Sequence, residues 1–180
     1  MGEVDWPLLR NKIRRGKLSN TFGAAIRIGL DGKPRNHQGW DFYAAEGTPC
    51  MAIASGMVVF VADKGDYGVQ LCHSFTFEGK KLYAFYAHLK RGSVLYQAGW
   101  PVELGKLIAL TGNTGNAENM KGEDQHLHFE IRDAHPAGAG MSNRISPVKV
   151  FKFCPLHQEA VKVTKGSTML YNAGIGSAVA

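Results

Sequence analysis

The segment Gln125-His126-Leu127-His128-Phe129-Glu130-Ile131-Arg132 alternates apolar and polar side chains along its whole length. This alternation is typical of a half-buried β-strand, whose successive side chains point to opposite faces. One face can enter a core, while the other presents two imidazoles about 6–7 Å apart. Such a pair is often only a surface feature or a satisfied hydrogen-bonding pair, so its meaning depends on partners elsewhere in the chain.

The remaining sequence predicts a mainly β fold built on an antiparallel sheet. Strands are expected over Pro49–Ala54, Met57–Ala62, Gly68–Phe77, Lys81–Leu89, Lys106–Leu110 and His126–Arg132. The short glycine-containing gaps between them favour hairpins over long crossover connections. Residues 5–16 predict a short N-terminal helix, with Asp5 as its cap and Pro7 in its first turn.

The length of 180 residues suits one domain with a core of its own. We expect an N-terminal helical extension over residues 1–20, a main domain over residues 21–150 and a C-terminal extension over residues 151–180. From about Gly166 the residues are small and show no pattern, which predicts a loosely held tail.

The formal charge of +6 and the pI near 9.3 favour an anionic partner. Nucleic acid, a membrane surface and the bacterial cell wall all satisfy that condition. The strongest strands present histidines instead of interleaved basic and aromatic residues, which disfavours nucleic acid. We expect no membrane span, because no apolar run has the necessary length, and no secretory signal is visible at the start.

The three cysteines are Cys50, Cys72 and Cys154, and they lack the Cys-x-x-Cys spacing of thiolate zinc sites. Cys50 and Cys72 lie in apolar, strand-like runs, which predicts buried free thiols. A Cys50–Cys72 disulfide is the alternative.

Three further motifs accompany the histidine-bearing strand. His37-Gln38-Gly39-Trp40-Asp41 places an imidazole and a carboxylate four residues apart, and Gly39 allows a bend between these two good zinc ligands. The predicted strand Tyr83–Leu89 carries His88 near its end. A glycine-punctuated hairpin over Gly99–Ala109 is followed by the turn Gly112–Gly115.

In this order, the motifs resemble those of the lysostaphin-type (LytM-like) zinc endopeptidases, which cut peptide cross-links of bacterial peptidoglycan. The family pattern runs H-x-G-x-D, G-T-P-V-x-A-x-x-x-G-x-V, Y-A-H-L, G-x-x-V-x-x-G, G-N-T-G and H-L-H-F-E. Its counterparts in this chain are His37–Asp41, Gly47–Val58, Tyr86–Leu89, Gly99–Gly105, Gly112–Gly115 and His126–Glu130. The resemblance spans about Thr21 to Arg132, and it implies that residues 21–150 form a catalytic domain with a narrow groove walled by loops.

The resemblance implies that His37, Asp41 and His128 bind one zinc ion, the sole cofactor. Three protein ligands leave a fourth position for water, whose pKa zinc lowers to about 7. His126 and His88 are then the catalytic histidines that are not ligands. His126 can take a proton from the water, and His88 can serve the oxyanion or the leaving amine, although the division of roles stays open.

The other three histidines and Glu130 are neither zinc ligands nor catalytic residues in this interpretation. We expect His73 to be structural, His135 and His157 to be surface residues, and Glu130 to hydrogen-bond near the site. Three departures from the family concern the cleft walls: the segment Gly23–Asn36, Trp100 in place of an acidic residue, and the long acidic loop Asn116–Gln125. These departures affect the substrate and leave the metal site intact.

The implied function is that of a zinc metalloprotease that degrades the cell wall by hydrolysing peptidoglycan. Its partners would be peptide stems and cross-bridges, met in the periplasm or the extracellular wall by a monomeric enzyme. The alternative is a non-catalytic module of the same fold that binds peptidoglycan or activates an amidase. An excised fragment, a phage lysin and an injected antibacterial toxin with a cognate immunity protein all fit a chain without a visible export signal.

Overall fold

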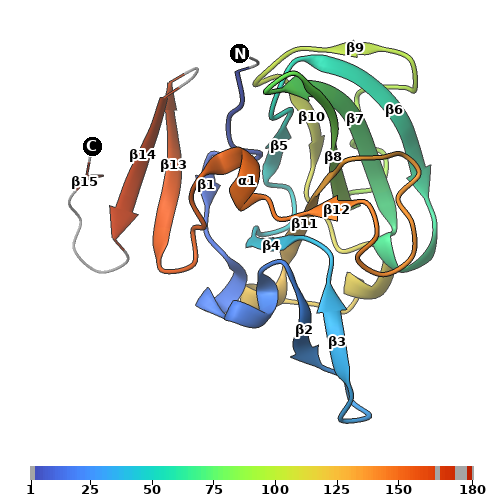
Figure 1. Ribbon diagram of the computed structural model, residues 1–180, viewed down its shortest axis with the longest axis vertical. Coiled ribbons are helices and arrows are strands. Elements are labelled where there is room, and N and C mark those ends of the chain that lie inside the picture. The colour runs from blue at the N-terminus through green and yellow to red at the C-terminus, as the bar shows by residue number, and fades with distance from the viewer. Residues whose placement is uncertain (1–2, 165–166, 173–177, 180) are drawn as a thin grey trace.

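The computed structural model describes residues 3–164, 167–172 and 178–179 (Figure 1). Its strands are β1 (Arg10–Asn11), β2 (Gly23–Ile28), β3 (Pro34–His37), β4 (Trp40–Tyr43), β5 (Pro49–Met51), β6 (Gly56–Asp63), β7 (Val69–Phe77), β8 (Lys80–Leu89), β9 (Pro101–Val102), β10 (Leu107–Leu110), β11 (His126–Arg132), β12 (Arg144–Ile145), β13 (Gln158–Thr164), β14 (Ser167–Asn172) and β15 (Ala178–Val179). The helical elements are α1 (Val148–Phe151) and the 3-10 turns η1 (Arg14–Gly16), η2 (Leu18–Asn20), η3 (Gly65–Tyr67), η4 (Gly115–Ala117) and η5 (Gly122–Asp124).

The largest sheet contains seven of the described strands and is antiparallel throughout. Its order is β12-β11-β8-β7-β6-β9, and β4 pairs with β11 on the edge that β12 also uses. The mainly β, antiparallel fold predicted from the sequence is therefore confirmed. The predicted strands agree closely with β6, β7, β8, β10 and β11, whereas β5 ends earlier, at Met51.

Strand β11 lies inside this sheet, and all seven of its residues are buried. Its apolar residues Leu127, Phe129 and Ile131 belong to the main hydrophobic core. The alternating histidines occupy the opposite face, as a strand with a period of two requires. Burying both faces of one strand fixes its register, because a shift of one residue would bring the imidazoles into the core.

The main core is closed by aromatic residues that come from both ends of the chain. Trp6 stacks on Phe151 of α1, with ring centroids 4.4 Å apart and planes 11° apart. Trp40 of β4 stacks with both rings, with its ring centroid 6.5 Å from that of Trp6 and 6.0 Å from that of Phe151. Residues before 20 and after 150 thus pack against the same core as the main sheet.

The helix predicted over residues 5–16 does not form, so that prediction is wrong. Leu8 and Ile13 are buried, but Leu9 is 54% exposed, and this pattern does not make a helical face. The Asn11 side chain accepts a hydrogen bond from the Leu8 amide and donates one to the Leu8 carbonyl, which stabilises a tight turn. Strand β1 then pairs with β13 from the far end of the sequence.

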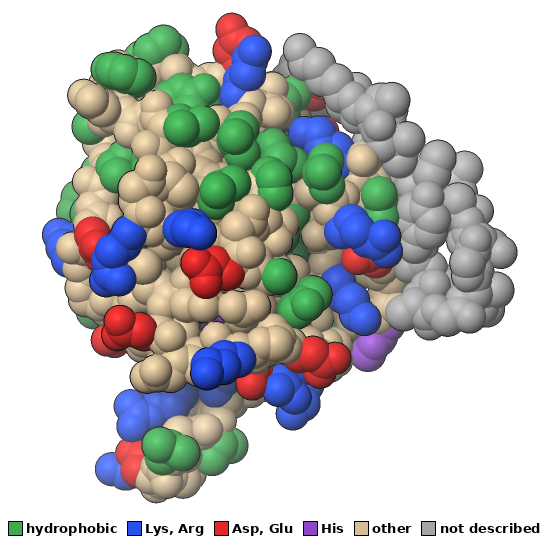
Figure 2. Space-filling model, turned by 180° about the vertical axis from the view of Figure 1, so that it is seen from behind, with side chains coloured by type: hydrophobic (Ala, Val, Ile, Leu, Met, Phe, Trp, Pro, Cys, Tyr) green, Lys and Arg blue, Asp and Glu red, His purple; other side chains and the backbone are tan. Residues whose placement is uncertain are grey.

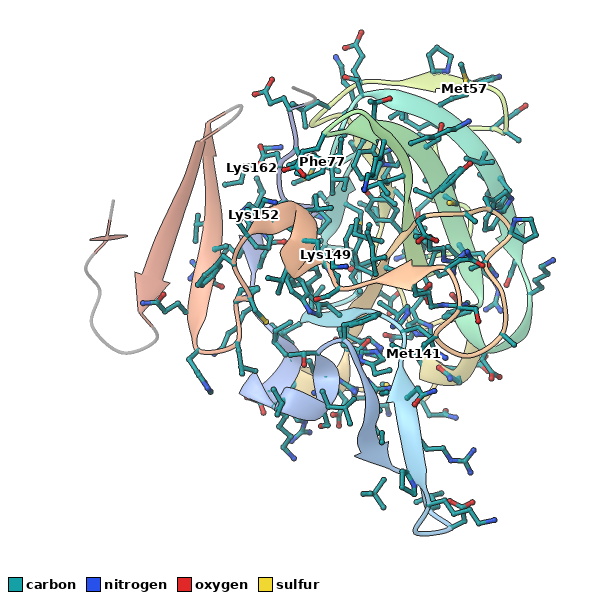
Figure 3. All side chains as sticks on the ribbon, in the orientation of Figure 1. Met57, Phe77, Met141, Lys149, Lys152 and Lys162 are labelled. Carbon is teal, nitrogen blue, oxygen red and sulfur yellow. The ribbon has the colours of Figure 1, made fainter. Side chains whose placement is uncertain are left out.

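A small second sheet joins the two ends of the chain, with the order β1-β13-β14-β15. Lys162 on β13 points toward the N-terminal segment (Figure 3), where its Nζ lies 3.1 Å from Asp5 Oδ2. The tail that was predicted from Gly166 falls partly outside the described residues. Its residues 167–172 form β14, which pairs with β13 over six positions.

Cys50 and Cys72 are buried and unbridged, as predicted, and Cys154 is also a free thiol. Lys and Arg side chains are interspersed with Asp and Glu on the face shown in Figure 2. Within the described residues, no helix is long and apolar enough to span a membrane.

Candidate metal centre

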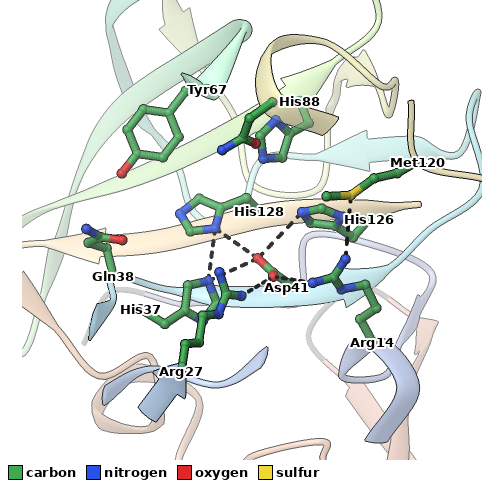
Figure 4. A pocket seen from close by; sticks show the side chains of 11 residues that line it. Arg14, Arg27, His37, Gln38, Asp41, Tyr67, His88, Met120, His126 and His128 are labelled. Carbon is green, nitrogen blue, oxygen red and sulfur yellow. Dashed lines mark hydrogen bonds and ion pairs between the residues drawn. The ribbon is translucent and has the colours of Figure 1, made fainter. Parts of the chain in front are cut away.

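Three side chains converge at one point between β3, β4 and β11 (Figure 4). His37 Nε2 lies 3.1 Å from Asp41 Oδ1 and 3.3 Å from His128 Nδ1, and the last two atoms are 2.9 Å apart. A tetrahedral zinc ion with bonds of about 2.0–2.1 Å needs ligand atoms about 3.3 Å apart. This triangle of two ring nitrogens and one carboxylate oxygen therefore fits zinc, and all three residues are buried.

Strand register and one glycine bring these residues together. Asp41 on β4 lies directly opposite His128 on β11. Gly39 lies in the bend before β4, where a Cβ atom would be 2.1 Å from the Phe129 carbonyl oxygen. Glycine is thus required by the close approach of the two backbones, and its bend lets His37 and Asp41 reach the same point.

Each of the two histidines in this triangle has its second ring nitrogen engaged. His37 Nδ1 donates to the Thr21 carbonyl at 2.8 Å, which leaves its Nε2 lone pair for a metal. His128 Nε2 lies 3.0 Å from Glu130 Oε1, which leaves its Nδ1 at the centre. Burial alone would lower the pKa of His128, but its hydrogen bonds to Asp41 and Glu130 raise that pKa to about 9. A proton and a metal ion therefore compete for this imidazole.

Two arginines bind the second oxygen of Asp41. Arg27 Nη2 donates to Asp41 Oδ2 at 2.5 Å, and Arg14 Nη2 does so at 3.3 Å. The carboxylate is thus oriented with Oδ1 toward the two imidazoles. Burial raises the pKa of Asp41, but neighbouring His126 and the hydrogen bonds with His128 and His37 outweigh it and hold the pKa well below its usual range.

His88 and His126 lie beside this triangle, with ring centroids 4.9 Å apart. The Nδ1 of His126 donates to the Asp124 carbonyl at 2.8 Å, and the Nδ1 of His88 donates to the Thr114 carbonyl at 2.9 Å. Both Nε2 lone pairs are consequently available in the cleft. Burial, and then the nearby imidazoles, lower the pKa of His88 to about 3, and burial also lowers the pKa of His126. Both rings are neutral at pH 7.

The turn Gly112–Gly115 positions His88. Thr114 Oγ1 accepts a hydrogen bond from the Val69 amide and donates to the Leu89 carbonyl, each at 2.9 Å, and its own carbonyl binds the imidazole. His88 has a positive φ of 57°, a conformation that costs free energy outside glycine. The surrounding hydrogen bonds maintain this conformation and turn the ring toward the centre.

The cleft over these residues encloses about 250 Å³. Its lining is completed by Arg14, Arg27, Gln38, Tyr67, Asn116 and Met120. Tyr67 was not predicted from the sequence as a site residue, and its hydroxyl donates to Glu130 Oε1 at 2.7 Å. Tyr67 lies in a short gap between two predicted strands, and nothing local indicated that this gap faces the cleft.

The remaining histidines follow their expected roles only in part. His73 is fully buried on the core side, where its Nε2 lies 3.3 Å from the Tyr86 hydroxyl, and it is structural as predicted. His157 is exposed, also as predicted. His135 is partly exposed, which agrees with the prediction only in part, because its ring also stacks on Phe60 with centroids 4.8 Å apart.

Comparisons with known proteins agree with this geometry. The model of peptidase family M23 matches residues 35–142, and the chain belongs to this family. The chain is 37% identical over 121 residues to an uncharacterized metalloprotease of Haemophilus influenzae, covering 66% of this chain and 23% of that protein. It is also 37% identical over 100 residues to the DD-carboxypeptidase/endopeptidase Mpg of Neisseria meningitidis, covering 54% and 20% of the two chains.

The fold is also that of a solved peptidase. The catalytic domain of the antimicrobial peptidase lysostaphin from Staphylococcus simulans superposes with a TM-score of 0.57 at 26% identity, covering 74% of this chain and 90% of that chain. The present chain spans only about a fifth of the length of the curated relatives that it matches.

Proposed function

We propose that this chain is a zinc-dependent endopeptidase that hydrolyses peptide cross-links of bacterial peptidoglycan. The observation that carries the proposal is the triangle of His37, Asp41 and His128 atoms, flanked by two neutral histidines with free Nε2 atoms. The names of the relatives, which include a DD-endopeptidase and lysostaphin, support this substrate class. The site of action would be the periplasm or the extracellular wall.

His37, Asp41 and His128 would hold the zinc ion, whose role when bound is to polarise the scissile carbonyl and make water acidic enough to attack near neutral pH. The protein has three tasks around it. It must accept a proton from the attacking water, stabilise the developing oxyanion and return a proton to the leaving amine.

His126 is placed to act as the general base. Its Nε2 is unprotonated at neutral pH and lies 3.7 Å from Asp41 Oδ1, beside the ligand triangle. Once protonated, the ring would be stabilised by the nearby Asp41 carboxylate and by the Asp124 carbonyl that accepts from its Nδ1. Its low pKa also favours transfer of that proton to the more basic leaving amine.

Tyr67 and His88 also line the cleft. The Tyr67 hydroxyl would offer a hydrogen-bond donor to the oxyanion, whereas the neutral His88 would accept a hydrogen bond at its Nε2. Tyr67 now donates to Glu130 Oε1, so binding of the substrate would exchange one acceptor for another. A non-catalytic module would not need these oriented hydrogen-bonding groups around a complete ligand set.

The proposal is tested by digesting purified peptidoglycan and identifying the new amino and carboxyl ends by mass spectrometry. Walls with glycine bridges and walls with direct D-amino-acid cross-links would be compared. We expect the parent protein to open peptide bonds and Asp41→Ala to be inactive. His157→Ala, which alters an exposed histidine that does not line the cleft, serves as the control and should match the parent. Cleavage of sugar linkages, or no cleavage of any wall by zinc-loaded protein, would contradict the proposal.

A further inference from the structure

The sheet face that carries the metal centre continues into a second cavity of about 530 Å³. Tyr67 lines both this cavity and the cleft over the metal site. The other residues around the second cavity are Phe60, Val61, Ala62, Lys64, Gln70, Arg132, His135, Pro136, Ala137 and Arg144. A chain bound over the metal centre can therefore extend past one tyrosine into this space.

Strand register places the cavity on the same face as the catalytic histidines. Glu130 lies opposite Phe85, Phe85 lies opposite Cys72, and Cys72 lies opposite Phe60. Arg132 follows Glu130 by two residues on β11 and shares its face. The cavity thus extends across β8, β7 and β6 from the row of polar side chains on β11.

The cavity has a surplus of positive charge. Lys64, Arg132 and Arg144 line it, and no Asp or Glu side chain does so among the described residues. Glu130 lies beneath and is fully occupied, because its Oε1 binds Tyr67 and His128 while its Oε2 binds Arg132 and Arg144. One carboxylate thus faces two guanidinium groups and cannot neutralise both.

Arg132 retains hydrogen-bonding capacity toward the cavity. The residue is only 5% exposed, and its guanidinium lies over the Phe85 ring at 3.6 Å. Its Nε donates to Glu130 at 2.7 Å, whereas no described residue accepts from its two terminal nitrogens. Arginine with free terminal N–H groups in a partly dry site is well suited to a planar anion such as a carboxylate.

The loop before β12 gives this cavity a fixed wall. Arg144 Nη1 donates to the carbonyls of Gly138, Gly140 and Ser142, which orders the loop around the side chain. His135 stacks on Phe60 on the same side. These contacts place apolar surface next to the guanidinium groups, as a ligand with both an aliphatic part and an anionic part requires.

We propose that this cavity is a substrate subsite that binds a free carboxylate of a peptidoglycan stem peptide, beyond Tyr67 from the metal centre. The inference rests on the proposed function and adds the substrate group that is selected. Arg132 and Arg144 bind the carboxylate, Lys64 adds charge at the mouth, and Phe60 contacts the aliphatic part of the residue.

The test uses two synthetic cross-linked stem peptides that differ only in whether their carboxylates are free or amidated. We expect the parent protein to show a KM about tenfold lower for the free-carboxylate peptide, with a similar kcat, because one charge-assisted hydrogen bond corresponds to about that factor. Equal kcat/KM and equal affinity for the two peptides would overturn the proposal.

Variants separate the cavity from the general charge of the protein. Arg144→Gln and Ala62→Glu should each remove the preference by raising KM for the free-carboxylate peptide alone, while Arg144→Lys should restore much of it. Ala62→Glu leaves all contacts of Glu130 in place. The proposal therefore stays testable even if Arg144→Gln does not fold. Lys149→Gln removes a positive charge from α1, outside the cavity, and should keep the preference.

Calorimetric binding of both peptides distinguishes failure of the subsite from failure of the proposed function. If neither peptide is hydrolysed but the free-carboxylate peptide still binds more tightly, and Ala62→Glu abolishes the difference, the subsite stands and the endopeptidase proposal falls. If both peptides are hydrolysed equally well and bind equally well, the endopeptidase proposal stands and the subsite proposal falls.

Discussion

The metal centre and the Arg132–Arg144 cavity lie on one sheet face but are built in different ways. Strands β4 and β11 hold two of the three ligand residues in register, and β3 brings the third. The cavity takes one wall from the loop before β12 and another from the turn η3, whose Tyr67 it shares with the cleft, and its floor lies on strands. Strands thus provide the accuracy that the chemistry needs, while loops provide the surface that selects a substrate.

Removing the metal should have the largest effect, because the ligand triangle would then have no chemical function. We expect a chelator to reduce wall digestion to background and one equivalent of zinc per chain to restore it. Zinc content and activity, measured together during the titration, check this prediction. A fully active preparation without metal would show that catalysis does not depend on the metal centre, and would contradict the division of tasks between the metal centre and the cavity.

Tyr67→Phe tests the residue that the two regions share. We expect kcat to fall by about 10²–10³-fold, as is typical when one oxyanion donor is lost, while zinc content stays the same. The variant keeps the ring and removes only the hydroxyl that now contacts Glu130. An unchanged kcat would show that Tyr67 has no role in the reaction and only separates the cleft from the cavity.

His73 is a buried histidine that stands outside the site, and it should respond to pH through stability. Burial lowers its pKa to about 4, below the unfolded value of about 6.5. The unfolded chain therefore binds a proton more readily, so stability falls as the pH drops below about 6.5. The full loss of about 3 kcal/mol is reached below about pH 4.

Urea unfolding gives the free energy of unfolding of His73→Asn and of the parent protein at several pH values between 7 and 4. The contribution of His73 is the difference between the two proteins in how steeply this free energy falls with pH. His157→Asn, a substitution of an exposed histidine, is the matched control and should leave the pH dependence of the free energy of unfolding unchanged. Parallel curves for His73→Asn and the parent would show that His73 does not contribute to acid sensitivity.

Arg27→Gln should have the smallest of these effects. The substitution removes the 2.5 Å contact to Asp41 Oδ2 and leaves the weaker contact of Arg14. Loss of a residue that orients a metal ligand typically costs about 10–100-fold in metal affinity. Competition with a zinc indicator measures this loss, and Arg35→Gln, an exposed change on the neighbouring strand, should retain the parent affinity.

Short-range patterns in the sequence predicted β6, β7, β8, β10 and β11, and alternation identified β11 as a strand with two different faces. The five histidine and aspartate positions of the site came instead from the resemblance of the ordered motifs to the lysostaphin-type family. The structure brings these predicted residues together in one cleft.

The parts that sequence did not predict depend on distant partners. The N-terminal segment has helix-like caps, but β1 pairs with β13, about 150 residues later in the chain. The ordered loop around Arg144 depends on one guanidinium that binds three backbone carbonyls and Glu130. Neither arrangement has a periodic sequence pattern. The cavity wall that the loop before β12 forms could therefore not be predicted from the sequence.

We propose that the two histidines on one face of β11 have different tasks, with His128 as a zinc ligand and His126 as the general base. The most direct test compares His126→Ala with His128→Ala for zinc content and for peptidoglycan digestion. We expect His126→Ala to keep one zinc per chain and lose about 10²–10⁴-fold in activity, and His128→Ala to lose both. Loss of zinc in His126→Ala, or parent-like digestion by that variant, would contradict the account.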